Sequence, residues 1–141
     1  MQRSGQHAAR VLVVEDDADL ARTIADALGD EGYAVQIAQH GDHALAICEQ
    51  WPPDAIVLDH NLPVMSGEEF LQEIRWQPAL SRVPVLLVSG LGEVAGIARR
   101  LHLQHFLRKP FGRDALLAAV SRMLANVTLP RRVSHVPGMR E

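Results

Sequence analysis

The stretch AIVLDHNLPVMSG, residues 55–67, joins a hydrophobic run to an acid and then to a loop that contains proline and glycine. Its first four residues are apolar, a pattern typical of a strand that is buried on both faces of a sheet. Asp59 ends the run, and Pro63 and Gly67 indicate a turn before a helix at 67–77. A carboxylate in this position is either a helix cap or a reactive group.

Outward from this stretch, apolar runs alternate with helical patterns. The sequence predicts strands at 10–15, 33–38, 55–59, 83–89 and 105–109. It predicts helices at 17–30, 42–51, 67–77, 93–102 and 113–125. Strands that alternate with helices form a parallel sheet with helices on both faces. We therefore predict a doubly wound α/β fold, a three-layer (βα)5 sandwich.

The ordered part of the chain is predicted to be one domain, residues 10–125. Residues 1–9 resemble a flexible lead, and the helical periodicity fails after about Asn126, so that 126–141 is predicted to be a flexible tail. A chain of 141 residues is long enough for one domain with a real core.

Composition narrows the class of protein. The formal charge of −3 argues against direct DNA binding, which usually requires a basic face. No apolar run is long enough to span a membrane, and the first ten residues have no apolar core of a signal peptide. The single cysteine rules out an internal disulfide, so we expect a cytoplasmic protein.

Several polar residues gather where the apolar strands end. Glu15, Asp16, Asp59, Ser89 and Lys109 all occupy such positions. In an open parallel sheet these ends share one edge, where ligands characteristically bind. Capping explains any one of the acids but is a poor account of all of them together.

Three carboxylates in one cleft repel one another, so we expect the site to raise the pKa of at least one of them or to recruit a cation. A small set of oxygen ligands suits Mg²⁺, and Mn²⁺ could take its place. Zinc is not indicated, because the sequence has no cluster of histidines or cysteines beside the acids. A carboxylate beside such an ion, with a lysine and a hydroxyl nearby, fits phosphoryl transfer to oxygen.

Four motifs carry a family resemblance: VVEDD at 13–17, LDHNLPVMSG at 58–67, LLVSG at 86–90 and LRKPF at 107–111. Together they resemble the receiver domain of bacterial two-component response regulators, from about Arg10 to Leu124. The resemblance implies a flavodoxin-like fold with the strand order 2-1-3-4-5. It makes Asp59 the phosphoacceptor. The same resemblance assigns Mg²⁺ to Asp16, the Asp59 side chain and the backbone carbonyl of Asn61, with Glu15 reaching the ion through water.

The resemblance also implies how the domain signals. Lys109 is the ammonium partner of the site, in a Lys-Pro step that is often cis, and Ser89 is the switch hydroxyl. Phe106 occupies the position of an aromatic residue that rotates inward after phosphorylation. The expected phosphodonor is a sensor histidine kinase or a histidine phosphotransfer protein. The surface around the strands at 83–89 and 105–109 and the helix at 93–102 would act on a downstream protein, or form a homodimer together with the helix at 113–125.

One region departs from the family pattern. The segment between Ser89 and Lys109 is about two residues shorter than in most receivers and has glycines at 90, 92 and 96. LHLQH at 101–105 replaces a common Leu-Gly-Ala-acidic pattern. We expect a short or displaced helix there, the least stable part of the fold, which phosphorylation reorders. Leu91 cannot orient an attacking water, so the phosphorylated state should not be unusually short-lived.

Several alternatives remain open at the level of sequence. A phosphatase of the haloacid dehalogenase type also uses an Asp nucleophile with Mg²⁺, but it normally has a second acid where this chain has Asn61. A flavodoxin-like cofactor binder lacks support, because acids follow the first strand where a phosphate loop would be needed. A pseudo-receiver that is never phosphorylated, and a receiver fragment of a hybrid histidine kinase, also remain.

Overall fold

The computed structural model describes residues 8–90 and 92–134, with side chains as far as residue 126. Its strands are β1 (Arg10–Val14), β2 (Ala34–Ala38), β3 (Ala55–Asp59), β4 (Val85–Ser89) and β5 (His105–Arg108). They form one parallel sheet in the order β2-β1-β3-β4-β5. The predicted fold class and strand order are confirmed.

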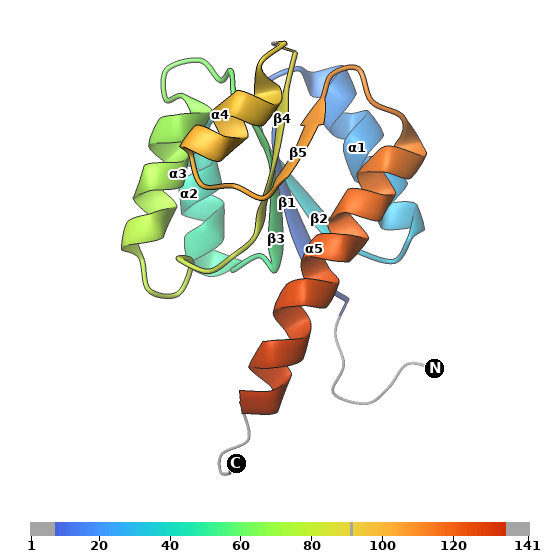
Figure 1. Cartoon of the computed structure of the whole chain (residues 1–141), viewed down its shortest axis with the longest axis vertical. Coiled ribbons are helices and arrows are strands. Elements are labelled where there is room, and N and C mark those ends of the chain that lie inside the picture. Colours follow the sequence, from blue (N-terminus) through green and yellow to red (C-terminus); the bar gives the residue numbers. More distant parts are fainter. Residues whose placement is uncertain (1–7, 91, 135–141) are drawn as a thin grey trace.

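Helices cover both faces of this sheet (Figure 1). Their bounds are α1 (Ala18–Asp30), α2 (Gly41–Gln50), α3 (Gly67–Trp76), α4 (Val94–Arg100) and α5 (Arg113–Ser134). One face packs against α1 and α5, through side chains such as Ile24, Leu28 and Val120. The other packs against α2, α3 and α4, through residues that include Phe70 and Ile74. These two cores bury alternate residues of the same strands, as a sheet covered on both sides requires.

The register of β1 and β3 brings distant acids together. Val14 is the partner of Leu58 in the parallel pair. Glu15 and Asp16 therefore leave the sheet beside Asp59, although more than forty residues separate them in sequence. All five residues of β3 are buried, as the apolar run predicted.

Two helices begin with side-chain caps that the sequence encodes. The Oδ1 of Asp17 accepts hydrogen bonds from the backbone amides of Asp19 and Leu20, at 3.0 and 3.1 Å, and begins α1 as predicted. Ser66 and Glu69 form a reciprocal capping box that begins α3. Both caps follow strand ends at the acidic edge, so they also fix the loops that carry the site.

The predicted end of the last helix at 125 is wrong. Helix α5 continues to Ser134 and projects beyond the sheet (Figure 1). Local propensity does not explain this extension, because residues 126–134 include Asn126, Val127, Thr128 and Pro130, which are poor helix formers. The flexibility predicted for 126–134 stays a prediction; residues 135–141, and residues 1–7 of the predicted lead, lie outside the described residues.

The region that departs from the family pattern has a short helix. Helix α4 has seven residues, and no side chain caps its first turn. His102 follows with a φ of +59°, in the left-handed region that glycine adopts without strain. Leu91 lies outside the described residues. None of the described helices combines the length and the hydropathy that a membrane span needs.

Candidate functional site

Backbone hydrogen bonds extend the sheet past its strands and fix the positions of the polar residues. The amide of Glu15 donates to the carbonyl of Ala38 at 3.0 Å. At the other side of the site, the amide of Lys109 donates to the carbonyl of Ser89 at 2.8 Å. The functional side chains therefore start from rigid backbone, which is what a preorganised site needs.

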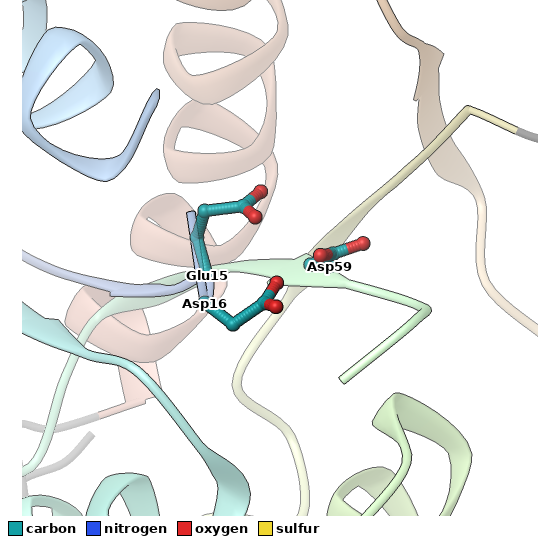
Figure 2. A group of neighbouring side chains, drawn as sticks. All are labelled: Glu15, Asp16 and Asp59. Atoms are coloured by element: carbon teal, nitrogen blue, oxygen red, sulfur yellow. The ribbon is translucent and has the colours of Figure 1, made fainter. Parts of the chain in front are cut away.

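The three acids form a cluster at the carboxyl ends of β1 and β3. Figure 2 shows Glu15 and Asp16 at the end of β1, with their carboxylates extending to the same side as that of Asp59. One carboxylate oxygen from each residue lies within 4.8 Å of the others. Glu15 is 1% exposed and Asp59 is 3% exposed, whereas Asp16 is open to solvent. The predicted meeting of these acids is thus observed.

Lys109 supplies the one positive charge that directly contacts the buried acids in the described part of the chain. Its Nζ lies 3.0 Å from Oε1 of Glu15 and 3.4 Å from Oδ2 of Asp59. Burial acts to lower the pKa of Lys109, but the close ion pair with Glu15 and the charge of Asp59 outweigh it and raise that pKa. Lys109 therefore stays protonated.

Glu15 carries the strongest electrostatic stress of the cluster. Burial raises the pKa of its carboxyl from 4.5 to about 7, and the charge of Asp59 adds to the increase. Lys109 and the backbone amide of Asp17 act in the opposite direction but do not outweigh burial. Its Oε2 accepts a hydrogen bond from that amide at 3.1 Å. The contact of Oε1 with Lys109 is an ion pair with poor hydrogen-bond geometry, so Oε1 is buried without a hydrogen bond among the described residues.

This donor set fits a hard divalent cation. Two buried carboxylates and one exposed carboxylate offer oxygen atoms within a single small region, as Mg²⁺ prefers. Oε1 of Glu15 has no hydrogen bond among the described residues. A cation, or a water molecule bound to a cation, would supply the missing interaction. The amide of Asn61 donates to Oδ1 of Asp59 at 3.1 Å. The role of the Asn61 carbonyl as a ligand stays a prediction.

The loop after Asp59 packs tightly against the site. A Cβ on Gly67 would lie 2.7 Å from the carbonyl oxygen of Asp59 and 2.9 Å from Cα of His60, so this position requires glycine. Val64 is 98% exposed and has a φ of +65°, rare for a β-branched residue. The sequence analysis missed this conformation, although the Pro63 turn signal marks the place.

The predicted switch residues occupy opposite environments. Ser89, the last residue of β4, is fully buried at the edge that carries the acids. Phe106 in β5 is 41% exposed, and its inward rotation stays a prediction. The Lys109–Pro110 peptide bond is cis, as the family resemblance implied. The structure thus gathers the three acids and places Lys109 in contact with Glu15 and Asp59.

Comparisons with known proteins agree with this geometry. A family model described as the response regulator receiver domain matches residues 11–121. The chain is 35% identical over 115 residues to the cell cycle response regulator CtrA of Brucella ovis, covering 79% of this chain and 48% of that protein. It is 32% identical over 118 residues to the sensor histidine kinase TmoS of Ectopseudomonas mendocina, covering 82% of this chain and 12% of that protein. The chain thus spans half or less of the length of these two relatives.

Solved structures give the same result. The chemotaxis protein CheY4 of Vibrio cholerae superposes with a TM-score of 0.77 at 32% identity, covering 83% of this chain and 99% of that one. The receiver domain of NtrX from Brucella abortus gives 0.75 at 34% identity, covering 82% and 98%. The acidic cluster is typical of the magnesium site of receivers. With a family match from β1 into α5 and this cluster in place, the chain belongs to the response regulator receiver domains, signalling modules of two-component systems that are not enzymes.

Proposed function

We propose that Asp59 accepts a phosphoryl group from a phosphohistidine of a sensor histidine kinase or a histidine phosphotransfer protein, in a reaction that depends on Mg²⁺. The observation that carries this proposal is the position of the Asp59 carboxylate, 3% exposed, between the Lys109 ammonium and the acids of β1. A carboxylate beside an ammonium group is supported electrostatically as a nucleophile for a phosphoryl group.

The residues have distinct roles in the proposed transfer. One carboxylate oxygen of Asp59 bonds to phosphorus as the bond from phosphorus to the donor imidazole breaks, and the imidazole keeps the electron pair. Lys109, 3.4 Å from Asp59, stabilises the negative charge of the acyl phosphate. Glu15, Asp16 and Asp59 would hold Mg²⁺, which when bound neutralises charge on the phosphoryl oxygens.

The response to phosphorylation is proposed to run through β4, α4 and β5. Ser89 would donate its hydroxyl to a phosphoryl oxygen, and Phe106 would turn inward as the backbone around Ser89 shifts. The seven-residue α4 has no side-chain cap, so this surface has little local stability to resist such a shift. Amide exchange should be faster in α4 than in β1 and β3; protection equal to that of the sheet would contradict this part of the proposal.

A labelling experiment tests the phosphoacceptor role. The chain is incubated with a small radiolabelled phosphodonor and Mg²⁺, and the label on the protein and the free phosphate are both measured. We expect stoichiometric labelling that is lost with EDTA and in Asp59→Asn, and kept in Asp26→Asn, which removes an exposed acid of α1. Rapid turnover with release of phosphate would instead support a phosphatase, and no labelling at all a pseudo-receiver.

The partners follow from the same proposal. The expected partners are a cognate kinase and a downstream protein that recognises the α4–β5 surface, without direct contact to DNA, and a homodimer would use the faces of α4, β5 and α5. A receiver within a longer hybrid kinase is a second candidate, because part of the sensor histidine kinase TmoS is 32% identical to this chain. A pull-down that compares wild type with Asp59→Asn separates partners of the phosphorylated state from the rest. The cytoplasmic location stays a prediction.

A further inference from the structure

A second site lies at the opposite edge of the sheet from the acidic cluster. A hollow of about 360 Å³ opens between the α3–β4 loop, the α4–β5 loop and α5, and we call it the basal hollow. Val85 and His105, the first residues of β4 and β5, line it. The acidic cluster occupies the carboxyl ends of the strands, and none of its members lines this hollow. The two sites are therefore separate.

The basal hollow concentrates positive charge in an acidic protein. Arg75 and Arg82 line it together with His102 and His105, and no acidic residue does. Arg122 lies close enough for its charge to add to burial in lowering the pKa of His105. The chain as a whole has a formal charge of −3, so this local excess of cations is a feature of the site and not of the composition. Such a concave basic surface attracts anions.

The guanidinium of Arg75 is held in place at the rim. Its Nη1 donates a hydrogen bond to the carbonyl of Ser81 at 3.0 Å. This is the single hydrogen bond of the Arg75 side chain to the described residues, and a guanidinium has five N–H donors. A fixed fork with spare donors matches the paired oxygens of phosphate.

The floor of the basal hollow is apolar. Val83, Leu103 and Met123 are buried beneath it. Gln104 and Asn126 add neutral hydrogen-bonding groups to the lining. An apolar floor under a cationic rim suits a ligand with an apolar or aromatic body that carries the negative charge at one end.

The dimensions favour a small molecule over a protein partner. Sites for small ligands commonly enclose about 300–1,000 Å³, a range that includes the basal hollow. A stable protein interface needs a surface of roughly 800 Å² on each partner, far more than one hollow of this kind offers.

We propose that the basal hollow binds a small organic phosphate of nucleotide size, with the phosphate on Arg75 and Arg82 and the organic body over Val83, Leu103 and Met123. Such a ligand would contact the loop that follows α4 without touching the phosphoacceptor site. It would give the domain an input separate from phosphorylation.

Amide chemical shifts of the full chain provide the test. The chain is labelled with ¹⁵N and titrated with adenosine, AMP, ADP and inorganic phosphate in EDTA, so that no divalent ion can hold phosphate at the acidic cluster. We expect saturable shifts at Val83, Leu103 and His105 with AMP and ADP, and binding of adenosine or of phosphate that is at least about tenfold weaker.

Variants test the assignment of the cations. Arg75→Gln and Arg82→Gln should each weaken ADP binding by about fivefold or more, because each removes a charged contact to phosphate. Arg22→Gln, an exposed cation of α1 that does not line the hollow, is the control with the same change of net charge. Thermal melting checks that each variant is folded, and Arg82 makes no hydrogen bond to the described residues whose loss could unfold the chain.

Several results would overturn the proposal. The proposal fails if no amide shifts appear below about 10 mM ligand, or if the shifts centre on Asp59 and Lys109. It also fails if adenosine and AMP bind equally well, or if Arg22→Gln loses as much ADP affinity as the variants of Arg75 and Arg82. Binding of an acidic peptide with no binding of nucleotide would also overturn it, because the occupant would then be a protein.

Discussion

Replacement of Glu15 by glutamine should stabilise the magnesium-free protein at alkaline pH. Glu15 is 1% exposed, and its Oε1 has no hydrogen bond within the described structure. Glutamine has nearly the shape of a protonated glutamate and carries no charge. The variant therefore resembles the low-pH form of the wild type, and it cannot acquire the buried charge that the wild type acquires as the pH rises.

The size of the effect follows from the pKa of the Glu15 carboxyl. That pKa is about 7 in the folded protein and 4.5 in an unperturbed side chain. Below pH 4.5 the carboxyl is protonated in both the folded and the unfolded chain. Between 4.5 and 7 only the unfolded chain releases the proton, so the free energy of unfolding falls as the pH rises. One pKa unit corresponds to about 1.4 kcal/mol, so the full loss above pH 7 is about 3 kcal/mol.

Urea unfolding of both proteins in EDTA at pH 5, 6, 7 and 8 measures this effect. The quantity of interest is the free energy of unfolding of Glu15→Gln minus that of the wild type, because titrating groups that do not contact Glu15 cancel in the difference. The difference should be small at pH 5 and rise to about 2–3 kcal/mol at pH 8. Asp26→Asn, an exposed acid of α1, should differ from wild type by less than about 0.5 kcal/mol throughout.

A difference that stays constant from pH 5 to pH 8 would refute the reasoning. So would a variant that is less stable than wild type at pH 8 by more than about 1 kcal/mol. Either result would mean that the Lys109 ion pair at 3.0 Å fully offsets the burial of the Glu15 carboxylate.

Three further predictions use the same unfolding assay or a simple variation of it. Mg²⁺ at about 100 times its Kd should raise the free energy of unfolding of the wild type by about 2.7 kcal/mol at pH 8, and that of Asp59→Asn by much less. Equal stabilisation of the two proteins would mean that the ion binds elsewhere. Gly67→Ala should destabilise the fold by about 2 kcal/mol and slow phosphorylation, because its Cβ would lie 2.7 Å from a backbone oxygen; unchanged stability would mean that the loop moves freely. His102→Gly should stabilise the fold by about 0.5–1 kcal/mol, because glycine adopts the φ of +59° at this position without strain. His43→Gly, inside α2, should destabilise the fold by a similar amount.

The sequence predicted the acidic cluster because the fold makes the ends of parallel strands meet. Alternating strands and helices specify a parallel sheet, and a parallel sheet brings every carboxyl end to one edge. Glu15, Asp16 and Asp59 had then to lie at the same edge of the sheet whatever the details of packing. The adjacency of β1 and β3 was the one step that required the family resemblance, since periodicity does not determine strand order.

Other features were beyond prediction because they depend on packing and not on pattern. The positive φ of Val64 contradicts the preference of a β-branched residue, so no local rule could anticipate it. The extension of α5 to Ser134 was missed because the added segment includes Asn126, Val127, Thr128 and Pro130. These residue types disfavour a helix, so local propensity predicts an end before them. The raised pKa of Glu15 depends on burial, which the position of a residue in the sequence does not give.

The distribution of stability across the domain explains how such a stressed site is tolerated and how it can signal. β1 and β3 carry the acids, and their residues beside the site are fully buried, so the sheet absorbs the repulsion without local opening. Helix α4, by contrast, has no side-chain cap, and an ion pair of Arg100 with Glu68 at 3.0 Å joins it to α3. The side chains of Arg100 and Glu68 are 56% and 34% exposed. Exposed pairs of this kind contribute about 0.2–1 kcal/mol. A change of charge at Asp59 involves several kcal/mol, so it can exceed the contribution of this ion pair, while the buried Val94, Ile97 and Ala98 still hold α4 on the core.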